Sequence, residues 1–329
     1  MSSPISKIFS RKKQANNRSA PQDGLHGEAI EALLTNGADI IVGKEQQLKL
    51  ALCCLLAGGH LLIEDLPGVG KTTLAQLLAH LLGLDYQRLQ FTSDMLPAEI
   101  IGAAIYDKAN GQFEFHRGPI FTQLLLADEI NRATPRAQSA LLEAMEERQV
   151  TAEGRTYPLP EPFFVIATQN PKDQFGTFEL PESQLDRFLM RISIGYPDAE
   201  SERALLSGEN RRQLLKQLSP VLDVQKLLEI QHRVGQQHAA PALIEYIQEL
   251  LDYSRQSDDF SHGLSPRAGL GLLQAAKSWA LIEGRQHVLP EDVQAVLDAV
   301  TSHRLGAHVS GSEEVTTSTK ILLESVAIP

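Results

Sequence analysis

The sequence predicts a three-layer α/β domain with a parallel sheet, followed by a domain made of helices. Short apolar, strand-like runs alternate with helical stretches up to residue 197, which is typical of a parallel sheet covered on both faces. One run, His60 to Glu64, leads into a glycine-containing turn and then a helix, the arrangement of a phosphate-binding loop. After Gly195-Tyr196-Pro197 the pattern changes to amphipathic helices. A domain boundary is therefore expected at residue 197.

Three segments follow from this pattern. Residues 25–197 are predicted to form the α/β domain and residues 198–329 the all-α domain. Residues 1–24 are predicted to be a flexible basic tail, because a signal peptide would need an apolar segment after its cations and none follows. The cations of this tail are Lys7, Arg11, Lys12, Lys13 and Arg18.

Apolar periodicity gives the elements in order. A helical stretch is expected over residues 28–58, with a break at Asn36-Gly37 and a restart near Gly43. The strands of the sheet are expected at residues 61–64, 86–91, 121–127, 163–168 and 188–194. Two hairpins are expected, over residues 103–116 around Asn110-Gly111 and over residues 149–159 around Glu153-Gly154. The helices of the second domain are expected to begin near Glu200, Leu222, Pro241, Pro266 and Pro290.

The composition of the 329 residues is that of a soluble globular protein, with 43% hydrophobic and 22% charged residues. A net charge of −11 argues against a broad nucleic-acid surface, which would need clustered Lys and Arg. No run reaches the ~20 apolar residues that span a bilayer. Cys53 and Cys54 are adjacent on an apolar helical run and are predicted to be core side chains. With no other cysteines, a reducing compartment, the cytoplasm, is expected.

The phosphate-binding loop is the most specific motif. Its residues are Pro67, Gly68, Val69, Gly70, Lys71, Thr72 and Thr73. Backbone N–H groups of the loop and of the following helix converge on phosphate oxygens, Lys71 adds a full charge, and Thr72 offers a hydroxyl to Mg²⁺. The strict pattern has Gly five residues before Gly70, and Asp65 occupies that position here.

Polar side chains end two later strands. Asp128 and Glu129 follow an apolar run, and Asn170 follows the next one. Ligands of open α/β sheets bind at the carboxyl ends of strands, so Asp128 is expected beside the loop as a Mg²⁺ ligand, through water. Glu129 is expected to activate the attacking water, and Asn170 to orient that water or contact the γ-phosphate.

Two arginines complete the candidate site. Arg187 precedes the last predicted strand, and Arg267 opens a helix of the second domain. Phosphoryl transfer depends on positioning the phosphates and neutralising their charge, so arginine side chains are expected to contribute to the site.

These motifs occur in the order and rough spacing of the AAA+ ATPases, and their detail closely resembles the MoxR family. The resemblance runs from about residue 28 to the C-terminus and is densest up to residue 197. It rests on the stretches 66–72, 90–92, 118–121, 128–133, 141–147, 167–171 and 185–188. In that family a residue such as Asp65 is ordinary at the first position of the loop, where the strict pattern has glycine.

The resemblance implies further roles. Arg187 resembles the arginine finger, which acts on a neighbouring subunit's ATP, and Arg267 resembles the sensor-2 residue, which couples lid movement to nucleotide. The two hairpins resemble the helix-2 insert and the pre-sensor-1 insert. Members of the family assemble as homo-oligomers, usually hexamers, and act as chaperone-like factors on protein clients, often beside a von Willebrand factor A domain partner.

Three other functions remain open at this stage. A nucleic-acid motor of the minichromosome-maintenance type would share the inserts, and a strongly salt-dependent affinity for DNA would reveal it. A chelatase ATPase subunit would need a porphyrin-binding partner. A small-molecule kinase would be active as a monomer and would give Arg187 no role across subunits.

Overall fold

The computed structural model describes residues 20–108, 111–170, 176–207, 211–307 and 314–328. Most of the predicted tail, residues 1–19, lies outside this range. Helix α2 (Ala20–Ala38) begins inside the last part of the segment predicted as tail.

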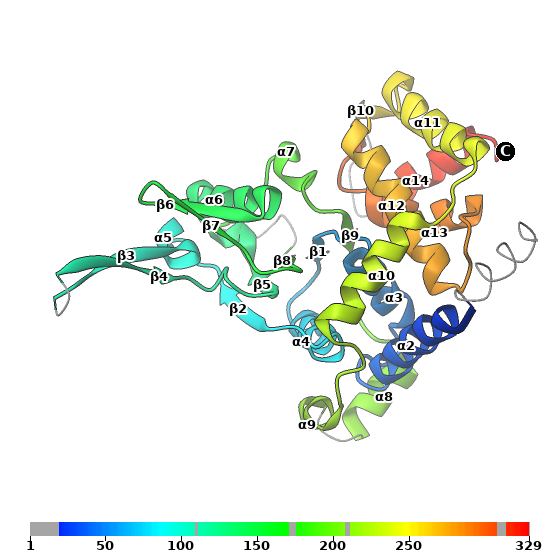
Figure 1. The fold of residues 1–329 in the computed structure, drawn as a ribbon. Coiled ribbons are helices and arrows are strands. Elements are labelled where there is room, and N and C mark those ends of the chain that lie inside the picture. The colour runs from blue at the N-terminus through cyan, green and yellow to red at the C-terminus, as the bar shows by residue number, and fades with distance from the viewer. Residues whose placement is uncertain (1–19, 109–110, 171–175, 208–210, 308–313, 329) are drawn as a thin grey trace, which may run out of the picture.

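The central sheet has five parallel strands in the order β2-β5-β8-β1-β9 (Figure 1). The strands are β1 (Leu61–Glu64), β2 (Tyr86–Gln90), β5 (Leu124–Asp128), β8 (Phe164–Gln169) and β9 (Met190–Ile192). In the paired register, Glu64 lies opposite Gln169 and Gln90 opposite Asp128. The carboxyl ends of β1, β8 and β5 therefore meet at one edge of the sheet, with β8 in the middle.

Helices cover both faces of the sheet, as predicted. Alternate strand residues enter two separate hydrophobic clusters, with Leu61 and Ile63 in one and Leu62 in the other. The first cluster contains residues of α3 (Glu45–Leu56) and α4 (Lys71–Leu81). The second contains residues of α5 (Pro97–Ile101), the 3₁₀ turn η1 (Ile130–Arg132) and α6 (Pro135–Glu147). The α/β prediction and its three layers are confirmed.

Two predicted boundaries differ from the structure. Helix α2 continues through Asn36-Gly37 and ends at Ala38. Gly37 does not interrupt the helix but allows it to pack closely against its neighbour. A Cβ on Gly37 would lie 2.4 Å from a methyl carbon of Leu48, so glycine lets α2 approach α3 closely. Strand β5 begins at Leu124 instead of Phe121, because residues up to 123 form a turn and a bend.

The helical lid consists of α10 (Val224–Gln236), α11 (Pro241–Gln256), α12 (Pro266–Ile282), α13 (Pro290–Thr301) and α14 (Glu314–Ser325). It is not purely helical, since β10 (Phe260–His262) and β11 (Gly306–Ala307) form a small antiparallel sheet. These strands are too short to give an alternating pattern in the sequence.

Helices α8 (Ala199–Ser207) and α9 (Arg211–Gln217) follow the predicted domain boundary but lie against the α/β domain (Figure 1). Arg211 Nη1 donates to the carbonyl of Asp39 at 2.7 Å. The ring Nε2 of His80, on α4, lies 2.6 Å from the carbonyl of Leu218. In space, the lid bundle thus begins with α10.

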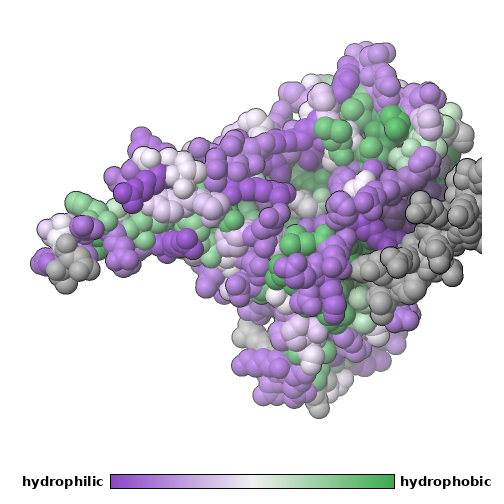
Figure 2. Space-filling model, in the orientation of Figure 1, coloured by the Kyte–Doolittle hydropathy of each residue, from purple (hydrophilic) through white to green (hydrophobic). Residues whose placement is uncertain are grey.

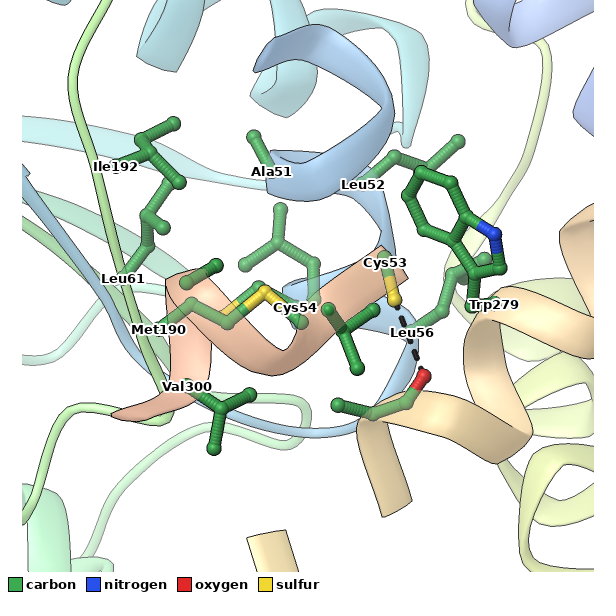
Figure 3. Packing of buried hydrophobic residues seen from close by; sticks show 14 of the residues in the cluster. Ala51, Leu52, Cys53, Cys54, Leu56, Leu61, Met190, Ile192, Trp279 and Val300 are labelled. Carbon is green, nitrogen blue, oxygen red and sulfur yellow. Dashed lines mark hydrogen bonds between the residues drawn. The ribbon is translucent and has the colours of Figure 1, made fainter. Parts of the chain in front are cut away.

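Helix α3 joins the sheet to the lid (Figure 3). Its residues Cys53 and Cys54 are fully buried, as predicted for core side chains, and Cys53 Sγ donates to the carbonyl of Ala275 on α12 at 3.3 Å. Burial raises the pKa of Cys53 to about 12, so this thiol stays protonated. Met190 of the sheet and Val300 of the lid lie in the same cluster. The two domains share one continuous hydrophobic core.

Both predicted hairpins are present and project to the side away from the lid (Figure 1). The first pairs β3 (Gly102–Asp107) with β4 (Gln112–Arg117), and its Asn110 lies outside the described residues. The second pairs β6 (Gln149–Ala152) with β7 (Arg155–Pro158) around Glu153 and Gly154, both at positive φ. Figure 2 shows apolar surface on the arm formed by β3 and β4. Phe115 stacks on Tyr157 at 4.3 Å between ring centroids, which holds the hairpins together.

Candidate active site

The phosphate loop connects the carboxyl end of β1 to the first turn of α4, as predicted. Gly68 and Gly70 have φ of 87° and 100°, a backbone region that L side chains rarely adopt. Gly70 is the residue immediately before α4, so the free N–H groups of Lys71, Thr72 and Thr73 begin the helix. This places a positive helix end at the loop.

Asp65 explains the departure from the strict loop pattern. Its Oδ2 accepts from Ile194 N at 2.7 Å, Gly195 N at 2.6 Å and Ser193 Oγ at 2.9 Å, all just after β9. Its Oδ1 accepts from Leu66 N at 2.7 Å. The carboxylate thus ties the start of the loop to the neighbouring strand end, which glycine could not do.

Lys71 lies at the centre of the loop. Its Nζ donates to the carbonyl of Asp65 at 2.5 Å and to Asn170 Oδ1 at 3.3 Å. Burial lowers the pKa of Lys71, and the carboxylates around it, Asp65 first, oppose that shift. Asn170 and Lys71 are therefore brought together, as expected from β8 lying next to β1.

Asp128 is buried at the end of β5 and both of its oxygens are engaged. Thr168 Oγ1 donates to Oδ1 at 2.6 Å, and Arg88 donates to Oδ2 from Nη2 at 2.6 Å and from Nε at 3.1 Å. The same Thr168 hydroxyl accepts from Glu129 N at 2.9 Å. Thr168 thus fixes the backbone of the acidic pair.

Glu129 occupies an unusual backbone conformation for a non-glycine residue, with φ 57° and ψ 49°. Such left-handed geometry costs about 1–3 kcal/mol and tends to occur at functional sites. Its carboxylate accepts from Arg132 Nη1 at 2.9 Å. The pair is partly exposed to solvent, so it is weak and exchangeable.

The residues at this edge suit a magnesium ion. Thr72 supplies a hydroxyl in the first turn of α4, and Asp128 supplies a carboxylate at a strand end. Oxygen ligands of this kind, few in number and completed by water, are what Mg²⁺ prefers in proteins. The Arg88 pair leaves Asp128 better suited to hold the ion through water than directly.

Arg187 and Arg267 come together at a different place. Arg187 Nε lies 3.6 Å from Glu146 Oε2, and Arg267 Nη2 donates to Glu146 Oε1. All three side chains line a cavity of about 340 Å³, together with Arg148 and His60. Arginine thus dominates the charge of this cavity.

This cavity lies at the opposite edge of the sheet from the phosphate loop. Its lining includes Gly58, Gly59 and His60, which precede β1, and Arg187, which precedes β9. The loop, in contrast, follows the carboxyl end of β1. Among the described residues that line the cavity, none belongs to the loop. The strand between them separates the two arginines from Lys71 of the same chain.

Comparisons with known proteins match this arrangement. Residues 60–190 match the ATPase family associated with various cellular activities (AAA), and residues 252–322 match the AAA lid domain. Chaperone MoxR1 of Mycobacterium tuberculosis is 38% identical over 94% of this chain and 86% of its own length. The chain belongs to the MoxR family of AAA+ ATPases. Protein MoxR of Paracoccus denitrificans is 33% identical over 81% of this chain and 85% of its own length.

Two further relatives extend the similarity over nearly the whole chain. The Bacillus subtilis protein YeaC is 42% identical over 88% of this chain and 90% of its own length. A crystal structure of a protein from Cytophaga hutchinsonii superimposes with a TM-score of 0.84 and 35% identity, covering 95% of this chain and 98% of that chain. The fold is therefore that of an AAA+ core with its lid.

Several residues of this MoxR-family site were not predicted from the sequence. Arg88 lies in mid-strand, and its meeting with Asp128 follows only from the pairing of β2 with β5. Thr168 ends the strand predicted over residues 163–168, but no sequence signal indicated its hydrogen bond to Asp128. Glu146 is one of several acids on α6 and carries no local signal.

Proposed function

We propose that this chain is a Mg²⁺-dependent ATPase whose active site is shared between neighbouring subunits of a ring, most simply a hexamer, and that the ring remodels or matures a partner protein. The observation that supports it is the separation of the two half-sites. The phosphate loop lies at the carboxyl edge of the sheet, and the two arginines lie at the amino edge. A head-to-tail ring brings the second edge of one chain to the first edge of the next.

On the phosphate side, the roles follow from charge and position. The loop backbone and Lys71 bind the phosphates of ATP, and Thr72 and Asp128 hold Mg²⁺, which neutralises charge on the phosphate oxygens. Glu129 activates the attacking water once its carboxylate has separated from Arg132. Asn170 senses the γ-phosphate through its contact with Lys71.

At the amino edge, Glu146 forms ion pairs with both Arg187 and Arg267 and so keeps the two guanidinium groups together. The partly exposed pairs are worth about 0.2–1 kcal/mol, so a triphosphate can replace the carboxylate. The structure places Arg267 beside Arg187, at the edge away from its own loop. We therefore assign both arginines to the neighbouring subunit's ATP, and Arg267 would couple movement of the lid to that nucleotide.

One relative's name and the surface of the hairpins support a protein client. A relative is named a chaperone, which supports a protein client. The projecting hairpins carry exposed Ile105, Tyr106 and Phe113, which suit contact with a polypeptide. A von Willebrand factor A domain protein is the partner that the family resemblance suggests. Among the described residues, no helix combines the length and apolar character that crossing a membrane requires.

Mixing of two inactive variants tests the shared site. Arg187→Ala keeps the loop and loses the finger, whereas Lys71→Ala keeps the finger and loses the loop. Mixed rings should regain ATP turnover, up to about a quarter of the wild-type rate for random assembly of a head-to-tail ring. Arg136→Ala, at an exposed position of α6, is the matched control and should remain active alone. No recovered turnover in the mixture would contradict the shared site.

A further inference from the structure

Arg304, in the turn that follows the lid helix α13, contacts the segment that carries the arginine finger. Its side chain is only 5% exposed. Nε donates to Asp186 Oδ1 at 2.7 Å, and Nη2 donates to the carbonyls of Phe188 at 2.6 Å and Asp186 at 3.2 Å. Nη1 donates to the carbonyl of Leu189 at 3.1 Å and to that of Val300. One guanidinium thus holds the backbone on both sides of Arg187.

Two further contacts bind the same segment to the lid. Ser265 Oγ donates to Asp186 Oδ2 at 3.1 Å and also caps α12 by accepting from Ala268 N at 3.1 Å. His303 Nε2 lies 3.0 Å from the carbonyl of Phe188. Since Arg267 opens the helix that Ser265 caps, Asp186 connects the positions of both arginines.

The electrostatics of Arg304 agree with a fixed arrangement. Burial lowers the pKa of Arg304, and the hydrogen bond and charge of Asp186 are the main opposing influences. The planar fork of an arginine satisfies several acceptors at fixed angles, which a lysine cannot do. Loss of Asp186 would leave the Arg304 charge buried without its counter-ion.

We infer that Arg304 is a positioning residue for the ATPase reaction: through Asp186 and the carbonyls of residues 186, 188 and 189 it fixes Arg187 relative to Arg267, so that both arginines meet the neighbour's nucleotide as one unit. The inference rests on the shared site proposed above. Movement of the lid would then move the finger of the same chain, because the finger segment is bound to the lid.

The test repeats the mixing assay with Arg304→Ala. If Arg304 acts on the finger face, this variant has an intact loop and a misplaced finger. It should lose about 100-fold in turnover, the scale of a misplacement near 1 Å. Mixed with Lys71→Ala it should recover turnover, and mixed with Arg187→Ala it should not.

The other results would overturn the inference. Recovery with Arg187→Ala but not with Lys71→Ala would mean that Arg304 serves its own chain's loop. Recovery with neither would mean a general structural role, and full activity of Arg304→Ala alone would mean no role. The pair Arg187→Ala with Lys71→Ala runs in parallel. If that pair fails, the shared site itself is wrong, and the inference falls for that separate reason.

Two more variants keep the test decisive if Arg304→Ala does not fold. Arg304→Lys keeps the charge and loses the fork, so it should lower kcat and leave the KM for ATP unchanged, because the loop is intact. Equal kcat to the wild type, or a raised KM alone, would contradict the inference. Arg285→Ala removes a different arginine–aspartate pair, with Asp292, within the lid, and should leave turnover unchanged.

Discussion

Asp65 stabilises the phosphate loop through its carboxylate. It is 8% exposed and accepts hydrogen bonds from two backbone N–H groups beyond β9, those of Ile194 and Gly195. Charge-assisted hydrogen bonds of this kind are worth about 1.5–3 kcal/mol each. The loop geometry therefore depends on a carboxylate that is bonded to the residues after β9.

Restoring the strict loop pattern with Asp65→Gly should weaken the protein. Two buried N–H groups would lose their acceptor, and the free energy of unfolding should fall by about 3 kcal/mol. Asp65→Asn, which keeps one acceptor oxygen, should lose less. Urea unfolding of the three proteins measures this. A glycine variant as stable as the wild type would show that the carboxylate is dispensable.

His60 should make stability depend on pH. It is buried between the sheet and α6, with Nδ1 accepting from Val165 N at 3.0 Å and Nε2 facing the carbonyl of Met145 at 3.3 Å. Burial lowers the pKa of His60 from 6.5 to about 4. As pH falls from 6.5 towards 4, the unfolded chain takes up a proton at this residue and the folded chain does not. Stability present above pH 6.5 is therefore lost, by about 3 kcal/mol in total.

The measurement is urea unfolding at pH 7.5 and pH 5 for the wild type and for His60→Gln. Glutamine can donate to the Met145 carbonyl but does not titrate in this range. The variant should lose less stability between the two pH values than the wild type. His232→Gln, at an exposed position on α10, should keep the wild-type slope. Equal slopes for His60→Gln and the wild type would contradict the assignment.

Glu129→Gln should bind ATP and fail to hydrolyse it. The loop and Lys71 remain, but the proposed general base is lost, which should lower turnover about 10²–10⁴-fold. Turnover and fluorescent-nucleotide binding measure the two properties separately. Glu143→Gln, an exposed acid on α6, should behave like the wild type.

The trapped Glu129→Gln complex also distinguishes the open functions. Affinity capture followed by mass spectrometry should retain a protein client. Retention of DNA with a strong salt dependence would favour the nucleic-acid motor instead. A metabolite phosphorylated by the wild-type protein would favour the kinase.

At the scale of elements, local pattern predicted most of the fold. The strand before the loop, Leu61–Glu64, and the helix starts at Pro241, Pro266 and Pro290 agree with the structure, because apolar period and proline position act locally. Elements whose ends depend on tertiary packing were less predictable. Gly37 stays inside α2 because Leu48 packs on it, a contact that no local signal encodes.

The candidate site also has one part that the sequence pattern predicted and one part that it did not. The loop, Asp128 and Asn170 were predicted because each ends or follows a strand, and strand order brings them together. The joining of Arg187, Arg267 and Glu146 was not predicted, because it needs the packing of α12 beside α6 and the segment before β9. Long-range side-chain partners such as Arg304 and Asp186 leave no periodic trace in the sequence.

A helix cap offers a prediction at this scale. Asp223 precedes α10 and its Oδ1 accepts from Lys226 N at 2.9 Å. Asp223→Ala should lower the free energy of unfolding by about 1 kcal/mol and leave kcat unchanged. Lys226→Ala keeps the cap and removes only an exposed ion pair, so it should change little. A neutral Asp223→Ala would show that α10 depends on its packing alone.

At the scale of the whole molecule, α3 and the Arg304 contacts bind the lid to the α/β domain. The hydrophobic cluster runs from the sheet through α3 to Trp279 and Val300 of the lid (Figure 3). The chain carries the phosphate loop at one edge of the sheet and the arginines at the other. In the proposed ring, the first edge of one chain meets the second edge of the next.

The central claim, an ATPase site completed by a neighbouring chain, is tested most directly by the turnover per chain as protein concentration is varied, with the particle mass recorded by light scattering in the same samples. We predict that turnover per chain falls on dilution in step with the loss of the oligomer, because separated chains lack arginines at the loop. Turnover per chain that stays constant while the protein is monomeric would contradict the account.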